Sequence, residues 1–157
     1  SNIFTKDEVI YRPDGILPVK IQDVEQLIEI KSTRAGVKRY QEGELPDTWI
    51  TYMEGGCYIR GVDSYNLSVI YLAERPSAKI VSETVYFDRD EIEKNWQWIL
   101  GRRDLYKKAL ETDTIPTPFT TAPSWMCSSC RYHTICQSIE MLKKREQVEK
   151  DIKELWG

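Results

Sequence analysis

Apolar and polar residues alternate along several short segments of the chain, a pattern that predicts β-strands. The alternation is clearest in residues 25–32, where Glu29 and Lys31 occupy one face and Ile28 and Ile30 the other. The predicted strands are residues 7–12, 16–19, 25–32, 66–73 and 79–87. Pro13-Asp14-Gly15 predicts a turn between the first two, and residues 74–77 predict a hairpin turn between the last two.

Apolar residues spaced three and four apart predict helices elsewhere in the chain. One helix begins at Asp47 or Thr48, either of which could cap it, and runs to about Arg60 despite the weakening pair Gly55-Gly56. Asp88 or Asp90 predicts the cap of a long second helix. One face of that helix carries, at spacings of three and four, Ile92, Trp96, Ile99, Arg103, Tyr106 and Leu110.

With the remaining segments, the predicted elements give a fold of the α/β class. Residues 33–46 are polar and predict a loop, and the prolines in residues 115–118 predict an extended segment. A last amphipathic helix is expected at residues 138–156, with the stripe Met141, Val148, Ile152 and Leu155. Strands, helix, strands and helix in that order predict a mixed central β-sheet flanked by helices.

Composition narrows the class of protein. The chain has 157 residues, 41% hydrophobic and 30% charged, which is typical of one folded domain rather than of a disordered chain. Neither a membrane span nor a signal peptide is apparent, so we expect a cytoplasmic protein that makes no membrane contact. The net charge of −3 does not favour DNA binding. Basic residues nevertheless cluster at Lys31, Arg34, Lys38 and Arg39, at Arg102, Arg103, Lys107 and Lys108, and at Lys143, Lys144 and Arg145.

Candidate chemistry begins with Asp14, Glu29 and Lys31. Glu29 and Lys31 share one face of a strand, Leu27 lies beside them, and Ile28 and Ile30 are expected to be buried on the other face. If the strand that follows Asp14 is adjacent, two carboxylates can bind one hard cation, for which magnesium is suited. Such an ion supports phosphodiester hydrolysis, with Lys31 orienting water or offsetting phosphate charge.

A second candidate site is Cys127-x2-Cys130-x5-Cys136. Three close cysteines in a reducing compartment indicate metal binding. The alternatives are an iron–sulfur cluster, a structural zinc ion completed by His133, and three buried free thiols. Cys57, which lies within the first predicted helix, is expected to be a core residue.

The order of motifs along the chain is Asp14-Gly15, Glu29-Ile30-Lys31, a tyrosine-bearing helix, a hairpin, a long helix and the cysteine segment. This order resembles that of the RecB-like PD-(D/E)xK nuclease superfamily. The resemblance covers residues 8–137 and is closest to CRISPR-associated and AddB-like exonucleases with iron–sulfur clusters. It implies a restriction-endonuclease-like core with Mg or Mn. It also implies that Asp14, Glu29 and Ile30 bind the metal, that Lys31 and Tyr58 assist catalysis, and that Cys127, Cys130 and Cys136 bind a 4Fe-4S cluster.

The chain departs from the family pattern in three places. No histidine precedes Asp14, the family's first cluster cysteine has no counterpart, and Glu54 stands where the family has glutamine in its Gln-x-x-x-Tyr motif. We therefore expect a single nuclease domain at residues 1–157 that lacks the family's N-terminal helical region and that could have lost its cluster. Within it, residues 1–123 are expected to be the catalytic core, residues 124–137 the cysteine segment and residues 138–156 the C-terminal helix.

The resulting expectation is a divalent-metal-dependent DNA nuclease, an exonuclease acting on single strands or free ends. The alternative is a non-catalytic nucleic-acid-binding or assembly module with a structural metal knuckle, in which Trp125 and Tyr132 stack on bases. A protein partner or a second copy could dock on the C-terminal helix, which could equally pack on its own domain.

Overall fold

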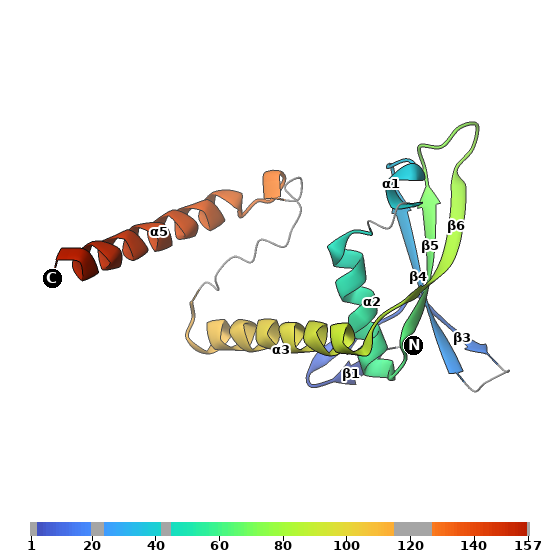
Figure 1. The fold of residues 1–157 in the computed structure, drawn as a ribbon, viewed down its shortest axis with the longest axis horizontal. Helices are drawn as coiled ribbons and strands as arrows, with labels where there is room; N and C mark the ends of the chain where they lie inside the picture. The colour runs from blue at the N-terminus through green and yellow to red at the C-terminus, as the bar shows by residue number, and fades with distance from the viewer. Residues whose placement is uncertain (1–2, 20–23, 42–44, 115–126, 157) are drawn as a thin grey trace. The chain divides into compact units, whose positions relative to one another are not determined.

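The computed structural model describes residues 3–19, 24–41, 45–114 and 127–156 (Figure 1). Two compact units are present, Ser1–Asp104 and Leu105–Gly157. All the strands that the structure describes lie in the first unit, with the first two helices, and the C-terminal helix lies in the second. Within the described residues, no helix is both long enough and apolar enough to span a membrane.

A four-stranded mixed sheet forms the centre of the first unit. Its strands are β3 (Gly15–Val19), β4 (Val24–Thr33), β5 (Ser64–Tyr71) and β6 (Lys79–Tyr86), in the order β3-β4-β5-β6. The β4–β5 pair is parallel, and the two outer pairs are antiparallel. The predicted mixed sheet and the predicted β5–β6 hairpin are therefore confirmed.

The N-terminal segment differs from its prediction. A strand was expected at residues 7–12, but β1 (Phe4–Lys6) and β2 (Val9–Tyr11) form a separate two-stranded hairpin. The residues between them, Asp7 and Glu8, have φ angles of 50° and 62°. Two consecutive positive φ angles give the turn whose twist suits a tight hairpin, so the expected strand is interrupted there.

The first two helices lie between β4 and β5 in the chain. Helix α1 (Lys38–Gln41) lies within the segment predicted to be a loop, so that prediction was wrong for these residues. Helix α2 (Asp47–Arg60) matches its predicted range, but Pro46 is its N-cap and makes no capping hydrogen bond, so neither Asp47 nor Thr48 caps it. The helix ends at Gly61, whose φ of 68° allows the left-handed C-cap.

Two longer helices follow the sheet. Helix α3 (Arg89–Glu111) begins at its predicted cap, because the Asp88 carboxylate accepts a hydrogen bond of 2.7 Å from the Asp90 backbone. Its stripe is buried at Ile92 and Trp96 but exposed at Leu110. Helix α5 (His133–Trp156) starts five residues before its predicted beginning at residue 138. The expected extended segment at residues 115–118 lies outside the described residues.

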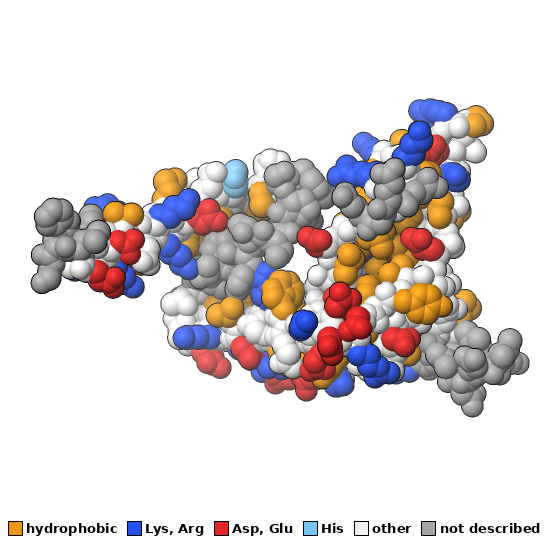
Figure 2. Space-filling view, in the orientation of Figure 1, with side chains coloured by type: hydrophobic (Ala, Val, Ile, Leu, Met, Phe, Trp, Pro, Cys, Tyr) orange, Lys and Arg blue, Asp and Glu red, His pale blue; other side chains and the backbone are white. Residues whose placement is uncertain are grey.

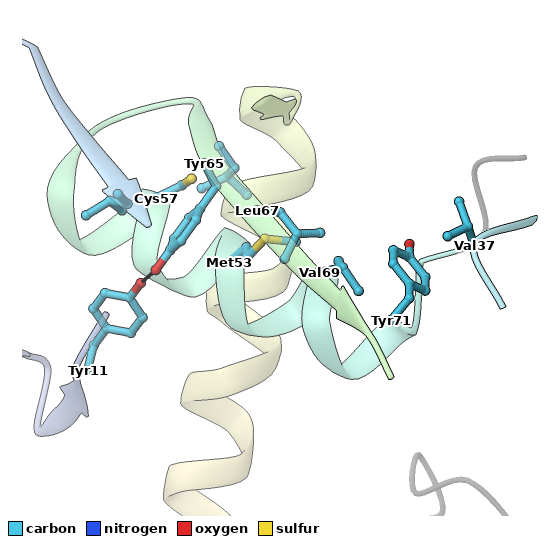
Figure 3. Packing of buried hydrophobic residues seen from close by; sticks show 10 residues of the cluster. Tyr11, Val37, Met53, Cys57, Tyr65, Leu67, Val69 and Tyr71 are labelled. Atoms are coloured by element: carbon cyan, nitrogen blue, oxygen red, sulfur yellow. Dashed lines mark hydrogen bonds between the residues drawn. The ribbon is translucent and has the colours of Figure 1, made fainter. Parts of the chain in front are cut away.

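The core of the first unit lies between α2 and one face of the sheet (Figure 3). Leu27 of β4 is fully buried there, as are Tyr65 and Leu67 of β5 and Met53 of α2. Ile28 and Ile30 were expected to be the buried set of β4, but Ile30 is 52% exposed. That expectation was wrong because α2 covers the face that carries Leu27, Glu29 and Lys31.

The glycine pair in α2 serves close packing. A side chain at Gly56 would overlap the ring of Tyr11, with its Cβ only 2.9 Å from Cε2. One at Gly55 would lie 3.1 Å from Ile99 of α3. The pair costs helix propensity. It lets an aromatic ring and a second helix approach the α2 backbone closely.

Candidate active site

Asp14 and β4 are joined by a direct hydrogen bond. Asp14 directly precedes β3, and its carboxylate Oδ2 accepts a hydrogen bond of 2.8 Å from the backbone N–H of Ile30. The last antiparallel pair is Gly15↔Ile28, so Pro13 is the next residue opposite Ile30. The Asp14 carboxylate thus accepts the Ile30 N–H just beyond the last β3–β4 backbone pair. This hydrogen bond holds the Asp14 side chain beside β4, the strand that carries Glu29.

Glu29 and Lys31 form an ion pair on the α2-covered face of β4. The Glu29 side chain is 3% exposed and that of Lys31 is 28% exposed. Burial raises the pKa of Glu29, the hydrogen bond and charge of Lys31 lower it, and the Asp14 carboxylate raises it further. The net direction is upward, so the folded protein holds an electrostatically costly carboxylate at this position.

The second oxygen of this carboxylate is unpaired among the described residues. Glu29 Oε2 is buried and accepts no hydrogen bond from any described residue. Buried carboxylate oxygens are normally paired, so an orphan oxygen requires a reason. A bound cation would supply the missing partner and relieve the repulsion between Glu29 and Asp14.

The donor set suits a hard cation. Two carboxylates are close enough to interact, and Ile30 can add only its backbone carbonyl. Pro13, opposite Ile30, has no N–H that could occupy this carbonyl. Among the described residues, no three His, Cys, Asp or Glu side chains gather into a metal-binding group. Two carboxylates and a backbone carbonyl could hold a hard cation only if waters completed its coordination.

Tyr52 of α2 belongs to the site, although sequence reasoning missed it. Its ring centroid lies 5.2 Å from Lys31 Nζ, and its hydroxyl donates a hydrogen bond to the Arg12 carbonyl. Burial raises the pKa of Tyr52 to about 12, with further contributions from Glu29 and Asp14. The tyrosine thus stays protonated and connects the lysine to the backbone just before Asp14.

Tyr58 lies elsewhere on the same helix. Its ring stacks on that of Trp96 of α3, with the two centroids 4.6 Å apart. Nζ of Lys6, a residue of β1, lies 4.2 Å from the centroid of the Tyr58 ring. Six residues separate Tyr52 from Tyr58, which rotates the second tyrosine well away from the first around the helix. The structure therefore brings Asp14, Glu29 and Lys31 together but does not bring Tyr58 to them. Spacing within the motif gave no sign of which turn of α2 faces β4.

Two further tyrosines lie beneath the site. The hydroxyls of Tyr11 and Tyr65 form a hydrogen bond (Figure 3). The centroid of the Tyr11 ring lies 5.1 Å from that of Tyr52. Burial raises the pKa of both Tyr11 and Tyr65, and the charge of Glu29 adds to both shifts. These groups remain neutral, so they stabilise the site through packing and hydrogen bonding rather than through charge.

The cysteine segment lies in the second unit. Cys130 donates its backbone N–H to the Cys127 carbonyl at 3.1 Å, and His133 donates to the Cys130 carbonyl at 3.0 Å. These bonds fold the segment into consecutive turns, and Cys127, Cys130 and Cys136 are free thiols. Trp125 lies outside the described residues. Cys57 is fully buried in the first unit, as expected of a core residue.

Comparison with known proteins gives little further information. No protein-family model matches the chain, and no curated protein matches it. A crystal structure of the protein SSO0001 is similar with a TM-score of 0.48 and 15% sequence identity. The match covers 87% of this chain and 56% of SSO0001, so the chain spans little more than half the length of that protein.

Proposed function

We propose that the chain is a divalent-metal-dependent nuclease that hydrolyses phosphodiester bonds in DNA, on a restriction-endonuclease-like PD-(D/E)xK core. The observation that carries the proposal is Glu29. Its carboxylate is buried beside Asp14 and paired on one oxygen with Lys31, and no described residue partners the other oxygen. Carboxylates with a perturbed pKa next to a specific charge partner are concentrated at functional sites, which supports the proposal.

The roles of the residues follow from their positions. Asp14, Glu29 and the Ile30 carbonyl would hold Mg²⁺ or Mn²⁺, which polarises a phosphoryl oxygen and acidifies a bound water. Lys31, partly exposed at the same point, would offset negative charge on the phosphate. Tyr52 would keep the ammonium group of Lys31 over its ring.

Basic residues near one end of β4 support a nucleic-acid substrate. Arg34, Lys38 and Arg39 are exposed directly after the strand that carries Glu29 and Lys31. Figure 2 shows Lys and Arg side chains gathered around α1 and the tip of the β5–β6 hairpin. Cations grouped in this way bind phosphates without reading sequence, so we propose DNA single strands or free ends as the substrate.

The test is cleavage of labelled single-stranded DNA in the presence of Mn²⁺. Glu29→Ala should lower the rate by at least ~100-fold, as expected when a metal ligand is lost. Glu83→Ala is the matched control, because Glu83 is an exposed glutamate on the same face of the sheet. Equal rates in the wild type and in Glu29→Ala would refute the proposal. Salt-sensitive DNA binding without cleavage would favour the non-catalytic binding module.

We also propose a metal centre at Cys127, Cys130 and Cys136, either a 4Fe-4S cluster or zinc with His133 as the fourth ligand. The support is the pair of backbone turns that follow Cys127, since tight turns are how closely spaced cysteines converge on one metal. Iron, sulfide and zinc content should fall in Cys130→Ser and stay unchanged in Cys57→Ala. Purified protein with neither metal would contradict the assignment.

A further inference from the structure

The two faces of the four-stranded sheet differ in charge. The face that α2 covers carries Glu29, Lys31, Lys79 and Glu83. The opposite side is here called the outer face. Its described side-chain positions are Gly15 and Leu17 of β3, Gln26, Ile28, Ile30 and Ser32 of β4, Ser64, Asn66, Ser68 and Ile70 of β5, and Ile80, Ser82, Thr84 and Tyr86 of β6. None of these fourteen is charged.

The outer face is also exposed and partly apolar. Exposed fractions reach 48% for Leu17, 52% for Ile30, 65% for Ile80 and 76% for Tyr86. The helix that packs on the sheet, α2, contacts the other face, and Figure 1 shows no described helix of the first unit on the outer side. In a chain with 30% charged residues, about four of fourteen solvent positions would carry charge. Their absence is typical of the buried centre of an interface.

Two central polar residues of the outer face already pair with each other. At its centre the hydroxyls of Ser68 and Ser82 form a hydrogen bond of 2.8 Å across β5 and β6. Groups that already have partners lose little when water is removed. The outer face can thus be covered without leaving a buried charge and with its central hydroxyls satisfied.

We propose that the outer face docks on the outer face of a second copy of this chain. Two identical uncharged surfaces meet without like-charge repulsion, whereas most partner surfaces would bring unpaired charges against it. With strands about 4.8 Å apart and about 3.3 Å per residue, each face presents roughly 500 Å². Two faces together cover roughly 1,000 Å², the lower limit for a specific interface. The product is a two-layer sandwich with sheets about 10 Å apart.

The experiment is sedimentation equilibrium or light scattering on the full chain. The wild type should have twice the monomer mass of 18.4 kDa. Ile30→Lys/Ile80→Lys should have the monomer mass, because both lysines would enter the interface. Both side chains are more than half exposed, so the variant should fold, and far-UV circular dichroism checks this. Tyr86→Lys is a second variant, at the most exposed of these positions.

Matched controls separate the outer face from other surfaces. Ile10→Lys changes a 72% exposed isoleucine of β2, away from the outer face, and should leave the dimer intact. Met141→Lys/Val148→Lys tests helix α5 and should also leave it intact. A wild type that stays monomeric overturns the proposal. So does a dimer that survives the outer-face variants, or one that is lost only when α5 is changed.

Discussion

Gly56→Ala tests the closest packing in the first unit. Alanine would gain about 1 kcal/mol of helix propensity over glycine. The added methyl group would overlap the Tyr11 ring, which is 5% exposed, packed at a tilt against Tyr52 and hydrogen-bonded to Tyr65. Overpacking costs ~1–3 kcal/mol, and breaking the buried hydroxyl pair costs ~1–3 kcal/mol more. The cost of the overlap exceeds the gain in helix propensity, so we expect the free energy of unfolding to fall by about 3 kcal/mol.

Thermal unfolding measures this loss. For a chain of this size about 3 kcal/mol corresponds to a fall in Tm of about 6–12 °C. Gly101→Ala is the matched control, because a side chain at Gly101 of α3 would meet nothing within 4 Å. It should raise Tm by about 2–4 °C from propensity alone. If both substitutions raise Tm equally, Tyr11 does not pack on the α2 backbone and the reasoning fails.

Two further predictions concern the candidate active site. Glu29 has a raised pKa, so the stability it contributes is full below its unfolded pKa and is lost as pH rises through its folded pKa. The free energy of unfolding of Glu29→Gln, measured by urea titration, should therefore rise relative to that of the wild type between pH 4 and pH 7, and a difference that does not change with pH would contradict the raised pKa. Tyr52→Phe removes the donor to the Arg12 carbonyl and should lower kcat about tenfold with little change in KM, as expected for one lost positioning hydrogen bond. A change confined to KM would instead place the Tyr52 hydroxyl in substrate binding.

Alternation in the sequence predicted β4 and both partners of the β5–β6 hairpin, because period-two patterns report strands directly. It could not identify the buried face of β4. Ile28 and Ile30 look like the core set by hydrophobicity, yet α2 covers Leu27 and Glu29. Hydrophobic pattern fails there because a buried carboxylate occupies a core position, which is where function and folding preference conflict.

Other differences have equally local causes. The β1–β2 hairpin was missed because its turn is Asp7-Glu8, without the glycine or asparagine that positive φ angles favour. Tyr52 was missed because its place at the site depends on how α2 lies against β4 and β2, a tertiary arrangement. Asp14, Glu29 and Lys31 were predictable because strand order and side-chain alternation alone bring them together.

The register of β4 against β3 and β5 has a consequence for how the chain tolerates change. Successive residues of β4 serve opposite sides, Glu29 toward α2 and Ile30 toward the outer face. Deleting or inserting one residue within this strand would transpose the two sets, moving the isoleucines under the helix and the carboxylate into water. A length change in β4 is thus expected to be far more damaging than any point substitution, since it would disrupt both surfaces at once.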